Sequence, residues 1–482
     1  MLQDSALITD LYQLTMAQAY WRANKLGTQA SFYMHFRENP FKGGYAVACG
    51  MAQVLEYIEG FTFTEEDIAY LSSVKSTSSN TLLFDQAFLK ELAGFTLTID
   101  IDAVREGEVV FPHEPLLRVT GPILQCQIVE TALLNFVGFE TIIATKAARI
   151  CSVARGPVAE FGLRRAQGPA GGVYASRAAI VGGCASTSNV MAGKRFGVQV
   201  SGTHAHSWVM AFDSELEAFR EYARTFSHNC ILLVDTYDTL SGVANAIIVG
   251  HEMEQRGEKL AGIRIDSGDL AWLSKRARDM LDKAGLTYVR IIASNDLDEY
   301  TIASLMTEQN APIDGWGVGT RLATAYDQPA LGCVYKMSAV RSDQSEQWKP
   351  CLKISEQTMK SSLPGILAAR RYTDAEGNMV GDMIYDLTTP PFDDYIIDPQ
   401  DDLRQKDLSK ATPFELLVPL VRGGAPVAPM PSALEARDVA RCSLAQVDES
   451  NKRLSNPHTY PVGLERSLLA TRDRLIREAR GL

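Results

Sequence analysis

The sequence predicts an α/β fold, with a parallel sheet closed into a βα barrel and a smaller α/β domain beside it. Between residues 198 and 320, a short apolar run followed by a stretch with helical spacing occurs five times. The runs end near Thr203, Asp235, Asp266, Ser294 and Thr320, so successive ends are 32, 31, 28 and 26 residues apart. That spacing accommodates a strand, a covering helix and two loops. A doubly wound sheet would be indicated by a GxGxxG turn or by a reversal of strand order. We see neither in the sequence, so we favour the barrel.

The two ends of the chain differ from this repeat. The N-terminal part mixes helical pieces with strand-like ones at Gln29–His35 and Phe95–Ile101. The C-terminal part has alternating strands around a turn at Glu376–Asn378 and ends in helices rich in Arg and Leu. We therefore expect residues 131–335 to form the barrel, and residues 1–130 and 336–482 to form the smaller domain. The expected barrel strands are Val198–Thr203, Ile231–Thr236, Gly262–Ser267, Val289–Asn295 and Gly315–Thr320.

Composition narrows the class of protein. A chain of 482 residues with 46% hydrophobic residues can build two domains, and a net charge of −11 disfavours nucleic acid and membrane surfaces as partners. The eight cysteines form no CxxC pair, which favours buried free thiols over a zinc site. Charged residues interrupt the apolar stretch Ile123–Thr145, so we expect a buried helix there. Met1–Asp10 does not resemble a leader, and a cytoplasmic enzyme is expected.

The ends of the apolar runs carry polar residues, and ligands of parallel α/β folds bind at the carboxyl ends of strands. Such residues can equally be helix caps, as Ser267, Asp269 and Asp296 could be. Gly317–Thr320 offers backbone N–H groups that suit a phosphate, although a plain turn explains it as well. The polar ends are Ser201–Ser207, Asp235–Thr239, Arg264–Asp269, Ser294–Asp296 and Gly317–Thr320.

One of the seven histidines stands out by its place. His206 follows an expected strand, where an imidazole can act as a nucleophile or proton carrier near pH 7. Asp235, at the end of the next strand, is the natural residue to orient its ring. His204 fits the same role on pattern alone, and either could be a structural histidine. The remaining five have no comparable setting: His35, His113, His228, His251 and His458.

Arginines supply a candidate anion pocket. Arg164 and Arg165 lie between glycines in Glu160–Gly168, and Arg264 ends another strand. The guanidinium fork binds phosphate or carboxylate in a bidentate manner, so these three could form a pocket in an acidic protein. Surface ion pairs are the alternative explanation.

Seven motifs, taken together and in order from about residue 6 to 340, resemble the nicotinate phosphoribosyltransferase family. The resemblance implies an irregular βα (TIM-like) barrel of the type II phosphoribosyltransferase kind, with a smaller α/β domain built from both chain ends. It also implies a homodimer with shared active sites. The motifs are Thr9–Met16, Asn39–Gly44, Glu160–Gly168, Gly202–Ser207, Asp235–Thr239, Arg264–Asp269 and Gly317–Thr320.

The implied reaction is an ATP-coupled pentosyl transfer in NAD salvage. Nicotinate, 5-phosphoribosyl 1-diphosphate, ATP and water become nicotinate mononucleotide, diphosphate, ADP and phosphate through a phosphohistidine. The resemblance selects His206 over His204 as the phosphorylated residue, with Asp235 as its partner. It further implies Mg²⁺ without naming its ligands.

The resemblance also assigns binding residues. Tyr12 and Phe161 should sandwich the pyridine ring, Thr203 and Arg264 should hold nicotinate and its neighbouring phosphate, and Ser188 should lie near the nicotinate. Tyr12 and the Asn39–Gly44 turn are expected to come from the second subunit. The phosphoribosyl side should be lined by Arg164, Arg165, Asp266, Ser294, Gly319 and Thr320.

Two alternatives remain. The sister enzyme that uses nicotinamide has an acidic residue where this chain has Ser188, and a carboxylate there would repel a carboxylate substrate. A catalytically silent regulatory relative is the other alternative, disfavoured by the intact histidine, arginines and acids. The chain departs from the family pattern at Leu363–Arg370, which is apolar after Pro-Gly, and at Pro169–Gly172, which lacks an acidic residue.

Overall fold

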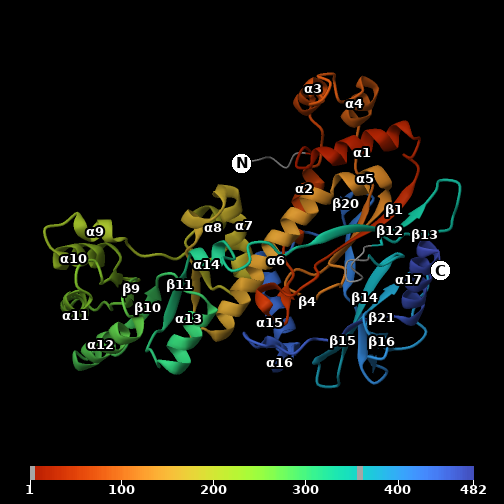
Figure 1. Cartoon of the computed structure of the whole chain (residues 1–482). Helices are drawn as coiled ribbons and strands as arrows, with labels where there is room; N and C mark the ends of the chain where they lie inside the picture. Colours follow the sequence, from red (N-terminus) through yellow and green to blue (C-terminus); the bar gives the residue numbers. More distant parts are fainter. Residues whose placement is uncertain (1–5, 355–361, 482) are drawn as a thin grey trace. The chain divides into compact units, whose positions relative to one another are not determined.

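The computed structural model describes residues 6–354 and 362–481, which form two compact units (Figure 1). One unit combines the two chain ends, up to residue 142 and from residue 330 onward, and the other comprises Ile143–Pro329. The residues of helix α6 (Glu130–Val153) fall on both sides of this division in the sequence.

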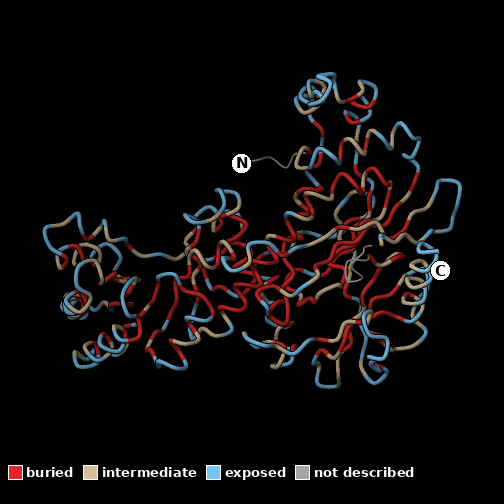
Figure 2. The backbone as a smooth tube through the Cα atoms, viewed as in Figure 1, coloured by how far each residue is buried: buried red, intermediate tan, exposed pale blue. Residues whose placement is uncertain are grey.

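The Ile143–Pro329 unit contains a six-stranded parallel sheet in the order β7-β6-β11-β10-β9-β8. Figure 2 shows β9 and β11 largely in the buried colour, as expected for strands covered on both faces. The strands are β6 (Val158–Glu160), β7 (Ser186–Thr187), β8 (Ile231–Leu233), β9 (Gly262–Ile265), β10 (Arg290–Ser294) and β11 (Gly315–Val318).

Four of the five expected barrel strands are confirmed, and one is wrong. Val198–Thr203 forms only an isolated parallel bridge, between Val200 and Thr187. The strands β6 and β7 were not expected, because runs of three and two residues are too short to show an apolar pattern.

The open side of this sheet, between β7 and β8, is closed by residues 199–204. Thr187 N–H donates to the Gln199 carbonyl at 3.0 Å, and Ser201 N–H donates to the Thr187 carbonyl at 2.9 Å. On the other side, Leu233 N–H donates to Nε2 of His204 at 3.1 Å. A side chain thus completes the ring where a backbone ladder is missing, which confirms the irregular βα barrel.

Helices follow the strands, and aspartates cap three of them. Asp238, Asp269 and Asp298 accept the N–H groups of Ser241, Trp272 and Thr301, so the strand-end loops turn directly into helices. Asp269 is therefore a cap, as foreseen, whereas Asp296 is not. The helices are α7 (Gly168–Val181), α8 (Val190–Phe196), α9 (His206–Met210), α10 (Glu215–Thr225), α11 (Thr239–Gln255), α12 (Leu270–Lys283), α13 (Glu299–Ala303) and α14 (Thr320–Ala323), with short turns η2 (Leu163–Arg165) and η3 (Ser304–Glu308).

The unit built from both chain ends contains two larger sheets and a two-stranded one. Their strand orders are β13-β12-β1-β5-β3-β19-β20, β17-β16-β21-β15-β14-β18 and β2-β4. The strands are β1 (Gln29–His35), β2 (Ala46–Val47), β3 (Asp100–Val104), β4 (Val109–Val110), β5 (Leu117–Pro122), β12 (Val334–Arg341), β13 (Lys349–Pro350), β14 (Leu367–Thr373), β15 (Met379–Asp386), β16 (Tyr395–Ile397), β17 (Gln405–Asp407), β18 (Thr412–Glu415), β19 (Leu417–Arg422), β20 (Ala425–Pro426) and β21 (Val462–Leu464).

Most expected elements of this unit are confirmed. Gln29–His35 is β1, and β14 and β15 form the hairpin around residues 376–378. Phe95–Ile101 is wrong in extent, since its strand begins only at Asp100. The helices are α1 (Leu11–Arg22), α2 (Met51–Gly60), α3 (Glu65–Ser73), α4 (Gln86–Ala93), α5 (Ile123–Ile128), α15 (Ala433–Gln446), α16 (Glu449–Lys452) and α17 (Arg466–Arg480), with the short turn η1 (Pro40–Lys42).

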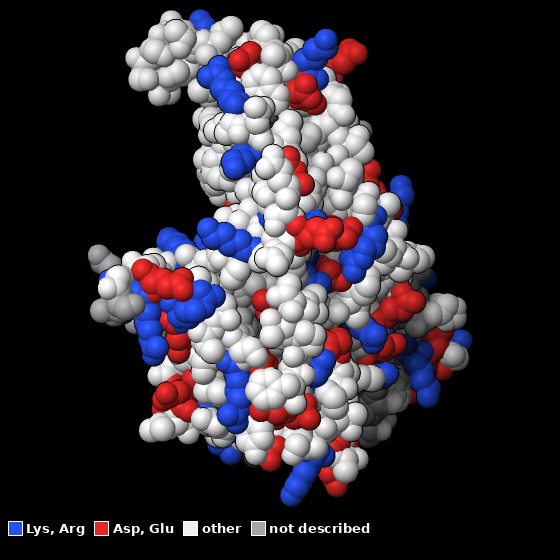
Figure 3. All heavy atoms as spheres, turned by 90° about the vertical axis from the view of Figure 1, so that its right-hand side faces the viewer, with Lys and Arg blue, Asp and Glu red and all other residues white. Residues whose placement is uncertain are grey.

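The surface charges, the helices and the cysteines of the structure agree with the expectations from the sequence composition. On the face drawn in Figure 3, basic and acidic side chains are interspersed, without one broad patch of a single sign. Within residues 6–354 and 362–481, no helix has both the length and the apolar character needed to cross a bilayer. All eight cysteines are free, and Cys442 is the exposed one among them.

Candidate active site

His206 is the first residue of α9, immediately after the segment that closes the barrel. Its imidazole is 41% exposed. Nδ1 lies 3.2 Å from the Thr236 hydroxyl, and Nε2 lies 3.9 Å from Oδ2 of Asp266. One ring nitrogen is therefore held by the loop after β8, while the other faces a carboxylate of the loop after β9.

His204 has a different environment from its neighbour. Its Nε2 accepts the Leu233 N–H, and its ring packs edge-on against Tyr222 at 4.7 Å between centroids. Burial lowers the pKa of His204 to about 4. This imidazole is thus neutral near pH 7, with its lone pair occupied, so it is suited to a structural role.

The geometry around Asp235 differs from the expectation. Its Oδ2 accepts Asp266 N–H at 2.9 Å and the Ser267 hydroxyl at 2.6 Å. Among the described residues, no hydrogen bond joins Asp235 to His206, and Asp235 Oδ1 has no hydrogen-bond partner. Because consecutive side chains of an extended segment point to opposite sides, Thr236 faces His206 and Asp235 faces the loop after β9. The direct orienting contact comes from Thr236, a residue that the sequence analysis missed.

A cavity of about 360 Å³ opens beside His206. Its volume is within the usual range for small-molecule sites. It brings together seven of the residues expected from the sequence, namely Phe161, Arg164, Ser188, Thr203, His206, Arg264 and Asp266.

Arg264 is a partly buried cation that lines this cavity. Its Nη2 donates to the His204 carbonyl at 3.1 Å, while its Nε has no hydrogen-bond partner among the described residues. Burial lowers the pKa of the guanidinium, which nevertheless stays charged at neutral pH. A partly buried arginine with an unused donor is suited to bind a carboxylate or phosphate.

The position of the Phe161 ring, which forms the aromatic wall of the cavity, depends on a glycine. A Cβ atom on Gly317 would lie 2.6 Å from the Phe161 ring, so only glycine lets the ring lie against β11. The preceding residue, Glu160, is fully buried and accepts hydrogen bonds from Ser176 at 2.8 Å and Thr187 at 2.6 Å. Glu160 thus anchors the Phe161 loop to its neighbours. A carboxylate directly before Phe-Gly was the available signal for this role.

Three expected phosphoribosyl residues lie next to the cavity without lining it. Ser294 donates its hydroxyl to Asp266 Oδ1. Gly319 is the N-cap of α14, and its Cβ position would be 3.3 Å from the Phe161 carbonyl. Thr320 begins α14, and its carbonyl accepts the Thr324 hydroxyl at 2.7 Å.

The structure does not bring two of the expected residues to this cavity. Arg165 is exposed on η2. Tyr12 is in the unit built from the chain ends, where it is 48% exposed and donates to Glu130 at 3.3 Å.

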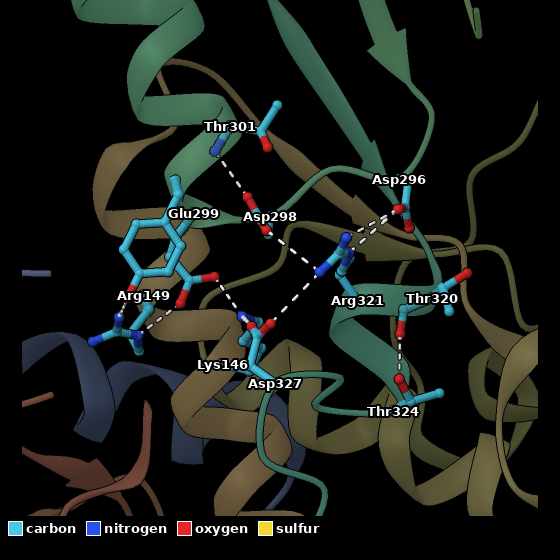
Figure 4. A network of polar contacts seen from close by, with 11 residues as sticks. Lys146, Arg149, Asp296, Asp298, Glu299, Thr301, Thr320, Arg321, Thr324 and Asp327 are labelled. Atoms are coloured by element: carbon cyan, nitrogen blue, oxygen red, sulfur yellow. Dashed lines mark hydrogen bonds and ion pairs between the residues drawn. The ribbon is translucent and has the colours of Figure 1, made fainter. Parts of the chain in front are cut away.

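An ion-pair network supports the loops after β10 and β11 (Figure 4). Arg321 lies 3.2 Å from Asp296 and 3.5 Å from Asp327. Lys146 is buried and contacts Asp327 at 2.5 Å and Glu299 at 2.6 Å. Asp296, one of the possible caps, is therefore part of an ion pair. The network fixes the start of α14, beside Gly319.

Known proteins were compared with the whole chain. The nicotinate phosphoribosyltransferase (NAPRTase) N-terminal domain matches residues 7–138, the NAPRTase family matches residues 157–380, and the C-terminal domain matches residues 368–472. Nicotinate phosphoribosyltransferase of Bacillus subtilis is 41% identical, covering 98% of this chain and 96% of that protein. The Dictyostelium discoideum protein of the same name is 36% identical, covering 96% and 87%.

A solved structure is similar over the same extent. The crystal structure of human nicotinic acid phosphoribosyltransferase has a TM-score of 0.84 and 31% identity, and covers 97% of this chain and 99% of that one. The chain belongs to the nicotinate phosphoribosyltransferase family of enzymes.

Proposed function

We propose that this chain joins nicotinate to 5-phosphoribosyl 1-diphosphate, with hydrolysis of ATP, to make nicotinate mononucleotide for NAD salvage. The observation that carries the proposal is that the half-exposed His206 lines one cavity with Arg264, which is partly buried and has a buried Nε without a partner among the described residues. The names of the similar proteins support the same substrate.

The nicotinate is placed in the cavity by its carboxylate and its ring. Arg264 and Thr203 bind the carboxylate and the neighbouring phosphate, and Phe161 offers its face to the pyridine ring. Because residue 188 is a serine, the cavity has no carboxylate at that position. Tyr12 of a second copy completes the sandwich in a homodimer with shared sites, which is consistent with its exposure.

His206 is the phosphate acceptor. With its proton on Nδ1, the ring donates to the Thr236 hydroxyl, and the Nε2 lone pair is free to attack the γ-phosphorus of ATP. The bond from that phosphorus to the ADP oxygen breaks, and ADP leaves with the electron pair. Water later attacks the phosphorus, the P–N bond breaks, and inorganic phosphate leaves. Asp235 acts as a positioning residue, because it holds the backbone of Asp266 and the Ser267 hydroxyl.

The transfer itself exchanges one bond at the anomeric carbon of the ribose. The pyridine nitrogen bonds to that carbon as its bond to the diphosphate oxygen breaks, and diphosphate takes the electron pair. Most of the catalysis comes from positioning the two reactants and from stabilising the negative charge of the leaving diphosphate. We assign the phosphoribosyl contacts to the groups around and beside the cavity: Arg164, Arg165, Asp266, Ser294, Gly319 and Thr320.

The donor atoms at this rim suit Mg²⁺. The side chain of Asp266 is 36% exposed and lines the cavity. Magnesium binds one or two carboxylates together with substrate phosphates, so Asp266 would hold it together with the phosphates of the substrates. When bound, the ion supplies neutralisation of polyphosphate charge.

We place the enzyme in the cytoplasm, which its eight free thiols support because a reducing compartment keeps cysteines unpaired.

One assay tests the function. The chain is incubated with 5-phosphoribosyl 1-diphosphate, ATP and Mg²⁺ plus either nicotinate or nicotinamide, and mononucleotide and ADP are measured. We expect mononucleotide and ADP to form in the reaction with nicotinate and not in the reaction with nicotinamide. Product from nicotinamide alone would identify the sister activity, and no product from either would identify a silent relative.

A further inference from the structure

A second cavity lies in the unit built from the chain ends, apart from the residues that carry the proposed transfer. Its volume is about 340 Å³. Apolar side chains of β15, β21 and α17 form its walls, among them Ile384, Leu464 and Ile476. Figure 1 shows these elements in the C-terminal part of the chain.

Two histidines without a role in the transfer meet in this cavity. His35 is 7% exposed and stacks on Tyr33, with centroids 5.0 Å apart and planes at 12°. Because residues 33 and 35 are two positions apart on β1, both rings project from the same face of the strand. His113 lies 6.0 Å from His35 between ring centroids. The cavity therefore has one aromatic side and one aliphatic side.

The polar groups here are uncharged or already paired. Nδ1 of His35 has no hydrogen-bond partner among the described residues. Burial lowers the pKa of His35 to about 3 and also lowers the pKa of His113, so both rings are neutral near pH 7. Arg472 is bound at its Nε and Nη2 by Asp473 and donates to the Pro399 carbonyl at 3.0 Å.

These features select a class of ligand. A planar ring fits between aromatic and aliphatic walls, and a hydrogen-bonding group on it can pair with the free nitrogen of His35. A cation is disfavoured by Arg37 and Lys336, whose charges act on His35. An anion is disfavoured in turn by Asp398, whose charge acts on His113, and Arg472, which lines the cavity, is already paired with Asp473.

We propose that this cavity is a second binding site for a small, uncharged, planar nitrogen heterocycle, held by stacking near His113 and by a hydrogen bond to His35. The proposal goes beyond the transfer reaction and does not depend on it. An unpartnered, nine-tenths buried imidazole nitrogen is costly without such a ligand or a water.

The test uses 7-azaindole as the probe and saturation-transfer NMR on the full chain. Ile476→Trp fills the cavity from a partly exposed helix, and Arg480→Trp on the same helix is the matched control. Arg264→Ala removes the main anchor of the other cavity. We expect 7-azaindole to bind to the unchanged chain and to the Arg264→Ala and Arg480→Trp variants, and binding to be lost in Ile476→Trp.

Further arms test the chemistry. His35→Phe retains the ring and removes its nitrogens, so we expect roughly tenfold weaker binding, the effect of one hydrogen bond. Benzoate, an anion of similar size, should bind more weakly than 7-azaindole to Arg264→Ala. The proposal is overturned if 7-azaindole does not bind at all, if Arg264→Ala abolishes its binding, if Ile476→Trp leaves it unchanged, or if benzoate binds better. Unchanged nicotinate transfer by Ile476→Trp shows that this variant is folded, and it separates this result from the proposed function.

Discussion

Two charged regions of this protein differ in how completely their groups are paired. In the unit built from the chain ends, Arg371 is fully buried and contacts Asp382 at 2.7 Å and Glu108 at 2.9 Å. The Tyr460 hydroxyl donates a further hydrogen bond to Asp382 at 2.9 Å. At the rim around His206, Arg264 Nε and Asp235 Oδ1 have no hydrogen-bond partner among the described residues.

The difference separates a structural cluster from a binding site. Burying a charge is costly unless it is paired, and the Arg371 guanidinium has carboxylate partners within the fold. Polar groups left incomplete beside an open cavity are instead available for a ligand. Variants of each region should therefore affect different quantities: stability in the first and chemistry in the second.

The largest effect is expected for His206→Ala with His204 intact. This variant should lose all phosphate transfer from γ-labelled ATP to the chain, because His204 has its lone pair bound to Leu233. ATP hydrolysis should no longer accompany transfer, while some uncoupled transfer persists. Label retained at wild-type level would refute the assignment of His206.

For the buried cluster, Arg371→Met should lower the free energy of unfolding by about 3–5 kcal/mol, since it strands buried carboxylates. Urea denaturation measures the change. Arg370→Met, next in sequence, removes a partly exposed pair with Glu415 and should cost at most about 1 kcal/mol. Equal losses of unfolding free energy in the two variants would contradict the expected difference between a buried and a partly exposed ion pair.

Acid should destabilise the fold through the neutral buried histidines. The pKa of His204 falls from 6.5 to about 4 on folding, so between these values the unfolded chain binds more protons. Stability is therefore expected to decrease as pH falls from 6.5 towards 4, with His204 contributing up to about 3 kcal/mol. His204→Gln, which can still accept from Leu233, should weaken this dependence in denaturation curves. A slope unchanged by that substitution would show that the pKa of His204 is the same in the folded and unfolded chain.

Smaller changes are expected from Ser188→Asp, which places a carboxylate in the nicotinate cavity. Charge repulsion should raise the KM for nicotinate by at least about tenfold while nicotinamide improves as a substrate. Val190→Asp, two residues along and 72% exposed, is the control and should change neither. An unaltered preference in Ser188→Asp would move the acid-selecting contact elsewhere.

Much of the fold was predictable because its signals are local. The runs ending at Asp235, Asp266, Ser294 and Thr320 form strands because apolar periodicity is visible in any one segment. The strands β6 and β7 were missed, since a few residues carry no period. The sequence could not show that Asp235 contacts the loop after β9 and Thr236 contacts His206, because the direction of a side chain after a strand depends on a single residue of register.

The sequence alone determined the repeat of the barrel, the family and seven of the residues that line the cavity beside His206, because these depend on residue type and order. Only the tertiary structure decided that His204 closes the barrel, that Thr236 holds His206, and that His35 and His113 share a cavity. Each of these depends on contacts between segments distant in sequence, whose geometry is set by packing and burial.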